Sequence, residues 1–250
     1  AMALVVILPG PEDLGAGQVV SALRRRGADA AVVPGAILEV SRWEHRVVGG
    51  RAETVITLPT GLQLSSASVG AVLNRLPGAS VRRFARSSER DLTYAAVESD
   101  ALLLAWLSGL EGRAVGTPSP VVTGEGAGAD GIPLKWLVWG RRCGLGGPRS
   151  VAVPRGLVAA GTGGDAAVER WTVVGHNVIR SGEVVEGEAA DRVRALAALA
   201  GMDLLEVLLR SGAGRRELVG VSLRPALTGV VADAVADLLV ERARGEELAS

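Results

Sequence analysis

The chain has 250 residues, which at about 150 residues per domain corresponds to one large domain or two small ones. Hydrophobic residues make up 48% and charged residues 22% of the sequence, and this composition excludes a disordered chain. Lys plus Arg and Asp plus Glu each number 27, and this balance argues against a protein that binds nucleic acid.

Cysteine and histidine are too rare to build a metal cluster. The single cysteine is Cys143, and the two histidines, His45 and His176, are far apart in the sequence, so we expect no disulfide framework and no metal site. No apolar run reaches the roughly 18 residues that a membrane helix needs, and the apolar start at Leu4 to Leu8 lacks the basic flank of a signal peptide. We therefore expect a cytoplasmic protein with no membrane partner.

The N-terminal third alternates strand and helix signals. Leu4 to Leu8 is a short apolar run ended by Pro-Gly, which is typical of a strand buried on both faces. Residues 14–26 have helical spacing and end in arginines before a glycine, and Ala30 to Val33 is strand-like, so we predict a parallel pair with a right-handed crossover. Residues 45–58 predict a hairpin, and Val69 to Leu73 predicts a buried strand.

The middle of the chain predicts a long helix and then a loop. Ser87-Ser88-Glu89 provides a capping residue and an acid for a helix that continues to Gly109. Residues 116–135 are rich in Gly, Pro, Ser and Thr, which is typical of a loop or linker, and Lys135 to Cys143 predicts a short amphipathic helix. Ser150 to Val153 and Leu157 to Ala160 are short strand-like segments.

The C-terminal third mixes strands and helices. Trp171 to Ile179 predicts one strand, and Ala189 to Ala200 predicts a helix ended by a glycine. Leu204 to Leu209 and Leu218 to Leu223 flank a turn-rich segment and predict an antiparallel pair, before a last helix over residues 230–243. The fold class is therefore α/β, with a small Rossmann-like N-terminal domain and an α+β C-terminal domain that contains an antiparallel sheet.

Several local patterns occur in a familiar order. Thr57 to Gly61 closes the hairpin, Val72 to Leu76 ends a buried strand, and Trp136 precedes Gly144-Leu145. Val173 to Val178 and the helix before Gly201-Met202 follow, and Pro225 precedes the closing helix. This order resembles an ATP-grasp protein of the kind that modifies or ligates peptides and carboxylates. The resemblance implies a pre-ATP-grasp domain at residues 1–115, a linker with a short helix at 116–148, and a truncated ATP-grasp-like domain at 149–250.

The resemblance also implies a chemistry. An ATP-grasp enzyme activates a carboxylate as an acyl phosphate, which an amine or similar nucleophile then attacks. This chemistry needs lysines that bind the nucleotide phosphates, and it needs acidic residues and an Asn that coordinate Mg²⁺. Here Lys135 is the single lysine, and the segment between Ser150 and Trp171 is short. The family's Asp ligand falls on Leu208, and its Glu-x-Asn falls on Gly220 to Ser222. We therefore expect a shortened, degenerate ATP-grasp-like protein with no cofactor and no catalytic residue.

Five residues are candidates for ligand binding: Asn74, Arg75, Glu98, His176 and Arg224. Asn74 and Arg75 follow a buried strand, at the edge where open α/β sheets bind ligands, and Arg75 could form a fork onto a carboxylate or phosphate. The alternative to ligand binding is structural: Asn74 would be a capping residue, and Arg75 would form an ion pair between domains. Glu98 lies on a solvated helix face or pairs with Arg75, and a lone His such as His176 is more often a packed or surface residue than a catalyst.

The expected function is a non-catalytic ATP-grasp-like protein that binds a partner. The partner would be a peptide, an active ligase or a second copy of the chain. Two alternatives stay open. One is a divergent, peptide-modifying ATP-dependent carboxylate–amine ligase. The other is an enzyme of different chemistry that uses an interdomain cleft around Arg75, Glu98 and Arg224.

Overall fold

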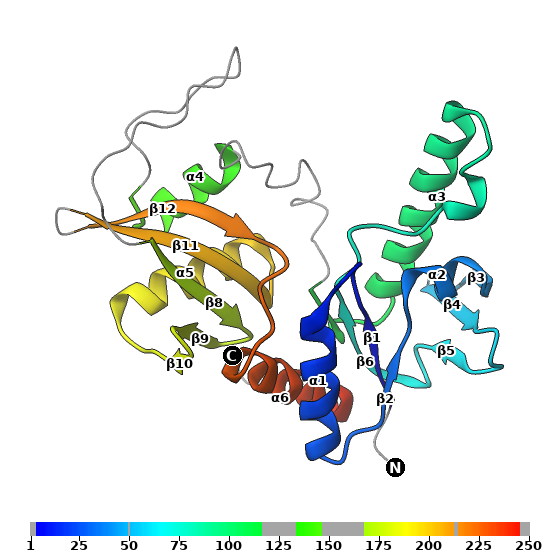
Figure 1. Cartoon of the computed structure of the whole chain (residues 1–250), viewed down its shortest axis with the longest axis horizontal. Helices are drawn as coiled ribbons and strands as arrows, with labels where there is room; N and C mark the ends of the chain where they lie inside the picture. The colour runs from blue at the N-terminus through cyan, green and yellow to red at the C-terminus, as the bar shows by residue number, and fades with distance from the viewer. Residues whose placement is uncertain (1–3, 50, 117–133, 147–167, 213–214, 246–250) are drawn as a thin grey trace. The chain divides into compact units, whose positions relative to one another are not determined.

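The computed structural model describes residues 4–49, 51–116, 134–146, 168–212 and 215–245, which form two compact units (Figure 1). The first unit holds residues 1–117 and 235–250, and the second holds residues 118–234. The predicted α/β class, with a Rossmann-like part and an α+β part, is confirmed. The division differs from the predicted domain limits at the C-terminal end, because residues from Val235 onward group with the first unit. The predicted limit between 148 and 149 lies outside the described residues.

A four-stranded parallel sheet is the centre of the first unit. Its order is β2-β1-β6-β7, with α1 (Leu14–Arg25) connecting the first two strands in the chain. The strands are β1 (Leu4–Leu8), β2 (Ala30–Val32), β6 (Val69–Asn74) and β7 (Ala114–Val115). All three pairings are parallel, so the predicted β1–β2 pair is confirmed. Every residue of β6 is buried, as expected for a strand inside a parallel sheet.

A small antiparallel sheet and a long helix complete the first unit. The sheet contains β3 (Arg42–Val48), β4 (Arg51–Thr57) and β5 (Gln63–Ser65), and the helices around it are α2 (Gly35–Glu39), η1 (Arg82–Phe84) and α3 (Glu89–Ser108). Trp43 of β3 meets Trp106 of α3 edge to face at 6.1 Å. Ser88 Oγ accepts a hydrogen bond from the Asp91 backbone N–H at 3.2 Å, which confirms the predicted helix cap.

The second unit is built on a five-stranded antiparallel sheet of order β10-β9-β8-β11-β12. Its elements are α4 (Leu134–Arg142), β8 (Val168–Val174), β9 (Asn177–Arg180), β10 (Glu183–Val184), α5 (Glu188–Ala200), β11 (Leu204–Gly212) and β12 (Arg215–Ser222), and α6 (Val230–Arg244) follows. The prediction of one strand over Trp171 to Ile179 is wrong. Val174 pairs with Asn177 across a tight turn, in which Gly175 has a φ of 57°.

The two faces of this sheet differ in character. Figure 1 shows α4 and α5 on one face, where Trp136, Trp171, Val173 and Leu209 belong to the hydrophobic core. Side chains alternate along a strand, so Glu206 and Leu208 project to the opposite face. The predicted strand-like segments at residues 150–153 and 157–160 lie outside the part of the chain that the structure describes.

Candidate functional site

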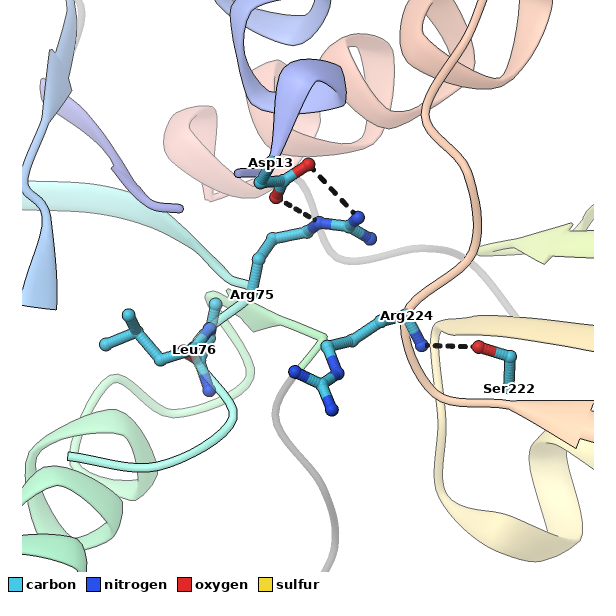
Figure 2. Close-up of polar contacts among 6 residues, drawn as sticks. Asp13, Arg75, Leu76, Ser222 and Arg224 are labelled. Carbon is cyan, nitrogen blue, oxygen red and sulfur yellow. Dashed lines mark hydrogen bonds and ion pairs between the residues drawn. The ribbon is translucent and has the colours of Figure 1, made fainter. Parts of the chain in front are cut away.

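Arg75 lies at the carboxyl end of the parallel sheet, where the chain leaves β6. Its Nε contacts Asp13 Oδ2 at 2.7 Å, and its Nη2 donates to Asp13 Oδ1 at 3.3 Å (Figure 2). The Arg75 and Asp13 side chains are only 9% and 8% exposed. The predicted fork onto a carboxylate therefore exists, but the carboxylate belongs to the same unit. Asp13 is not among the residues predicted from the sequence. Its position directly before α1 indicates a polar group at the end of the sheet, but nothing local connects it to Arg75.

The pair determines the charge state of Asp13. Burial by itself raises the pKa of this carboxyl group. The hydrogen bond and positive charge of Arg75, with backbone N–H groups of Ala16 and Gly10, outweigh burial and hold the pKa of Asp13 below its ordinary 3.8. At neutral pH the site is a buried, compensated ion pair.

The chain around this pair is closely packed. The side-chain oxygen of Asn74 accepts a hydrogen bond from the Leu76 backbone N–H at 3.2 Å, so it closes a turn directly after β6. A Cβ atom at Gly10 would lie 2.8 Å from the Arg75 carbonyl oxygen, so only glycine allows this approach between the ends of β1 and β6. Asn74 and Arg75 therefore both have internal partners.

The other candidate residues are exposed. Glu98 projects from α3 and forms no ion pair with any described residue, so of its two alternatives the structure has the exposed helix face and not the pairing with Arg75. His176 lies in the turn between β8 and β9, and its carbonyl oxygen accepts a hydrogen bond from Arg194 Nε at 2.7 Å. The Arg224 backbone N–H donates to Ser222 Oγ at 3.2 Å, as Figure 2 shows. Glu98 belongs to the first unit, and His176 and Arg224 belong to the second.

The positions on which the resemblance places the family's metal ligands lie on the face of the second sheet opposite α4 and α5. Leu208 and Gly220 are direct cross-strand partners. A Cβ atom at Gly220 would lie 2.8 Å from Leu208 Cδ1 and 3.3 Å from Leu208 Cβ and Cγ. The leucine side chain therefore occupies the space that a side chain at position 220 would need.

These positions do not fit a divalent cation. Mg²⁺ prefers oxygen ligands, and Leu208 and Gly220 have no side-chain oxygen. Ser222 has a neutral hydroxyl group, which accepts the Arg224 N–H and lacks the negative charge of the carboxylates that the resemblance implies at a metal site. Within the described ranges, no three His, Cys, Asp or Glu side chains gather as a possible metal site.

Glu206 is a buried acid that precedes Leu208 by two residues on β11 and lies on the same face of the sheet. It pairs in register with Ser222 on one side and Thr172 on the other, and its side chain is 9% exposed. Its Oε2 lies 3.4 Å from Arg170 Nε but has no hydrogen-bond partner in the described part of the structure. Burial raises the pKa of Glu206 above its ordinary 4.5, against the lowering effects of Arg170 and of a hydrogen bond from the Ala226 backbone.

The raised pKa of Glu206 predicts a pH-dependent stability. The protonated acid stabilises the fold fully below pH 4.5, and this contribution is lost as pH rises through the higher pKa of the folded state. We expect Glu206→Gln to raise the melting temperature at pH 8 relative to the unsubstituted chain, and to have a smaller effect at pH 4. Thermal unfolding at both pH values tests this, with exposed Glu183→Gln as the control. A lower melting temperature for Glu206→Gln at pH 8 would contradict it.

No described helix is long and apolar enough to cross a membrane. No protein-family model matches the chain, and no curated protein matches it.

Solved structures do match the chain over almost its full length. A RiPP-associated ATP-grasp ligase of Chryseobacterium gregarium, in complex with ADP and a leader and core peptide, aligns with a TM-score of 0.70 at 12% identity, covering 96% of this chain and 97% of that one. The ATP-grasp ligase PsnB, complexed with precursor peptide PsnA2 and AMPPNP, aligns with a TM-score of 0.70 at 18% identity, covering 97% of both chains.

A third match is the macrocyclase MdnC of Microcystis aeruginosa MRC, bound with precursor peptide MdnA. It aligns with a TM-score of 0.69 at 13% identity, covering 96% of this chain and 100% of that one. Because the alignments extend over both chains, they give no support to a truncated fold, which stays a prediction. Identities this low establish the fold alone: the chain has the fold of the ATP-grasp ligases.

Proposed function

We propose that this chain takes part in the ATP-dependent modification of a peptide, and that its leading function is that of a peptide-modifying ATP-grasp ligase. The observation that supports this most is the alignment of almost the whole chain with two ligases and a macrocyclase that were solved with peptides. A peptide is therefore the proposed partner. The comparisons favour the ligase over the non-catalytic role expected from the sequence.

The ligase function sets a requirement on this chain. As the resemblance implies, a peptide carboxylate would be phosphorylated by ATP, and an amine or similar nucleophile would then displace phosphate and form a bond to the acyl carbon. Leu208, Gly220 and Ser222 do not fit the cation that accompanies the nucleotide. Other groups of the chain would have to hold it.

A second candidate function is peptide binding without ligase chemistry. The contact of Leu208 with Gly220 favours it, because this contact puts an apolar group where the resemblance implies two carboxylates. In that role the chain would present a peptide to an active ligase. A homodimer and a cytoplasmic location stay predictions. The enzyme of different chemistry has less support, because the Arg75 guanidinium already pairs with Asp13.

One assay separates the two candidate functions. The full chain is incubated with Mg²⁺, ATP and a panel of synthetic peptides that contain carboxylate and amine side chains, and ADP release and peptide mass are followed. The ligase predicts peptide-dependent ADP release and a product lighter by one water for each bond formed. A peptide that binds in calorimetry but causes no ADP release would overturn the ligase and support the second function.

A further inference from the structure

The second unit contains a cavity on the helix-covered side of its sheet. Its volume is about 730 Å³, and it lies between the middle of β8, the ends of β9, β11 and β12, and the start of α5. Three arginines from three elements, Arg180, Arg192 and Arg216, line it together with Trp171. The other lining residues are Leu145, Val185, Glu186, Gly187, Glu188, Ala189 and Ser211. We refer to this cavity as the arginine pocket.

Trp171 organises two of the three arginines. The guanidinium carbons of Arg180 and Arg216 lie 5.1 Å and 4.9 Å from the centre of its ring, which is within range of a cation–π contact. The Trp171 side chain is itself fixed, because it is buried in the core and its Nε1 donates to Glu169 Oε2 at 3.1 Å. Two positive groups are therefore held at the pocket on a rigid support.

These arginines retain capacity to bind an anion. Glu169 Oε2 lies 3.6 Å from Arg180 Nη1 and 3.8 Å from Arg216 Nε, whereas a charge-assisted hydrogen bond measures about 2.7–2.9 Å. The buried Nε of Arg216 has no hydrogen-bond partner among the described residues. Since each guanidinium has five N–H donors, one shared carboxylate leaves most of them available to a ligand.

The acids that line the pocket have partners of their own. Glu188 is paired with Arg192, and Glu186 with Arg194. Arg192 also donates from Nη1 to the Gly144 carbonyl oxygen at 2.9 Å, which fixes its position on the wall. The start of α5 faces the same cavity, and a helix N-terminus adds a partial positive charge.

We propose that the arginine pocket binds a carboxylate of a peptide, with Arg180 and Arg216 as the main contacts. The proposal rests on the peptide partner proposed above and specifies its chemistry at one site. The carboxylate comes from an acidic side chain or from a C-terminus. The pocket lies on the opposite side of the sheet from Leu208 and Gly220, so it is a binding site separate from the aligned metal-ligand positions.

The test measures binding of a fluorescein-labelled, glutamate-rich peptide with blocked ends to the full chain. We expect saturable, salt-sensitive binding, a loss of at least about tenfold in affinity when the glutamates are replaced by glutamines, and a similar loss in Arg180→Gln/Arg216→Gln. A glutamine-rich peptide with a free C-terminus distinguishes the second source of the carboxylate. Arg210→Gln is the matched control for the single variants Arg180→Gln and Arg216→Gln, because it removes the same one positive charge from the other face of the sheet.

Each outcome has a defined consequence. If the double variant and the unsubstituted chain bind the glutamate-rich peptide with equal affinity, the proposed role of the arginine pocket is wrong. The same conclusion follows if neither carboxylate probe binds. Circular dichroism of the double variant verifies that it is folded. If the double variant no longer binds the probe and the unsubstituted chain releases ADP with a peptide, both the pocket proposal and the ligase proposal are supported. If ADP release is observed while the probe never binds, only the pocket fails.

Discussion

Asp13→Ala should lower the free energy of unfolding by about 3–5 kcal/mol, because it removes the buried carboxylate that pairs with the buried Arg75 guanidinium. Removing one member of a buried ion pair costs far more than the pair contributes, since the remaining charge stays desolvated. Urea denaturation at pH 7 would measure the change as a lower midpoint with an unchanged slope.

Two controls make this result specific. Glu98→Ala, on the exposed face of α3, should change the stability by no more than about 0.5 kcal/mol. Asp13→Leu/Arg75→Met should be less destabilised than Asp13→Ala, because no buried charge remains. The contribution of Asp13 should be present above pH 3.8 and lost as pH falls through its lower folded pKa. Equal stability of Asp13→Ala and the unsubstituted chain at pH 7 would contradict the buried pair.

Gly220→Ala should destabilise the second unit by about 1–3 kcal/mol, because its Cβ would lie 2.8 Å from Leu208 Cδ1. Truncation of the leucine removes the atoms that clash, so Leu208→Ala/Gly220→Ala should be more stable than the sum of the single changes predicts. Urea denaturation of the four proteins completes a double-mutant cycle. Additive effects of the two substitutions would show that the close contact is absent.

The sequence predicts elements well where local signals are strong. The helix α3 begins after Ser88, as its capping pattern indicates, and α5 ends at Gly201, whose φ of 66° suits glycine. The prediction of one strand over Trp171 to Ile179 failed because apolar residues occur on both sides of the turn at Gly175, and one glycine is a weak turn signal. The short elements α2 and β5 have three to five residues each and carry little periodicity.

Candidate sites were harder to predict because their residues meet only in the folded chain. The partner of Arg75 is 62 residues away in the sequence, and no local pattern connects Asp13 to it. The arginine pocket gathers Arg180, Arg192 and Arg216 from β9, α5 and β12, and nothing in their spacing indicates a common site. By contrast, the sequence predicted that the last two strands form an antiparallel pair, and the resemblance placed two of the family's ligands on Leu208 and Gly220 in these strands. The structure has the two residues opposite each other.

The most direct measurement for the proposed function is binding of the nucleotide analogue AMPPNP, with Mg²⁺, to the full chain by isothermal titration calorimetry. A ligase must bind its nucleotide, so we expect a saturable heat of binding with the analogue and displacement of the analogue by ATP. A folded chain that binds its peptide but gives no heat with the analogue would contradict the ligase.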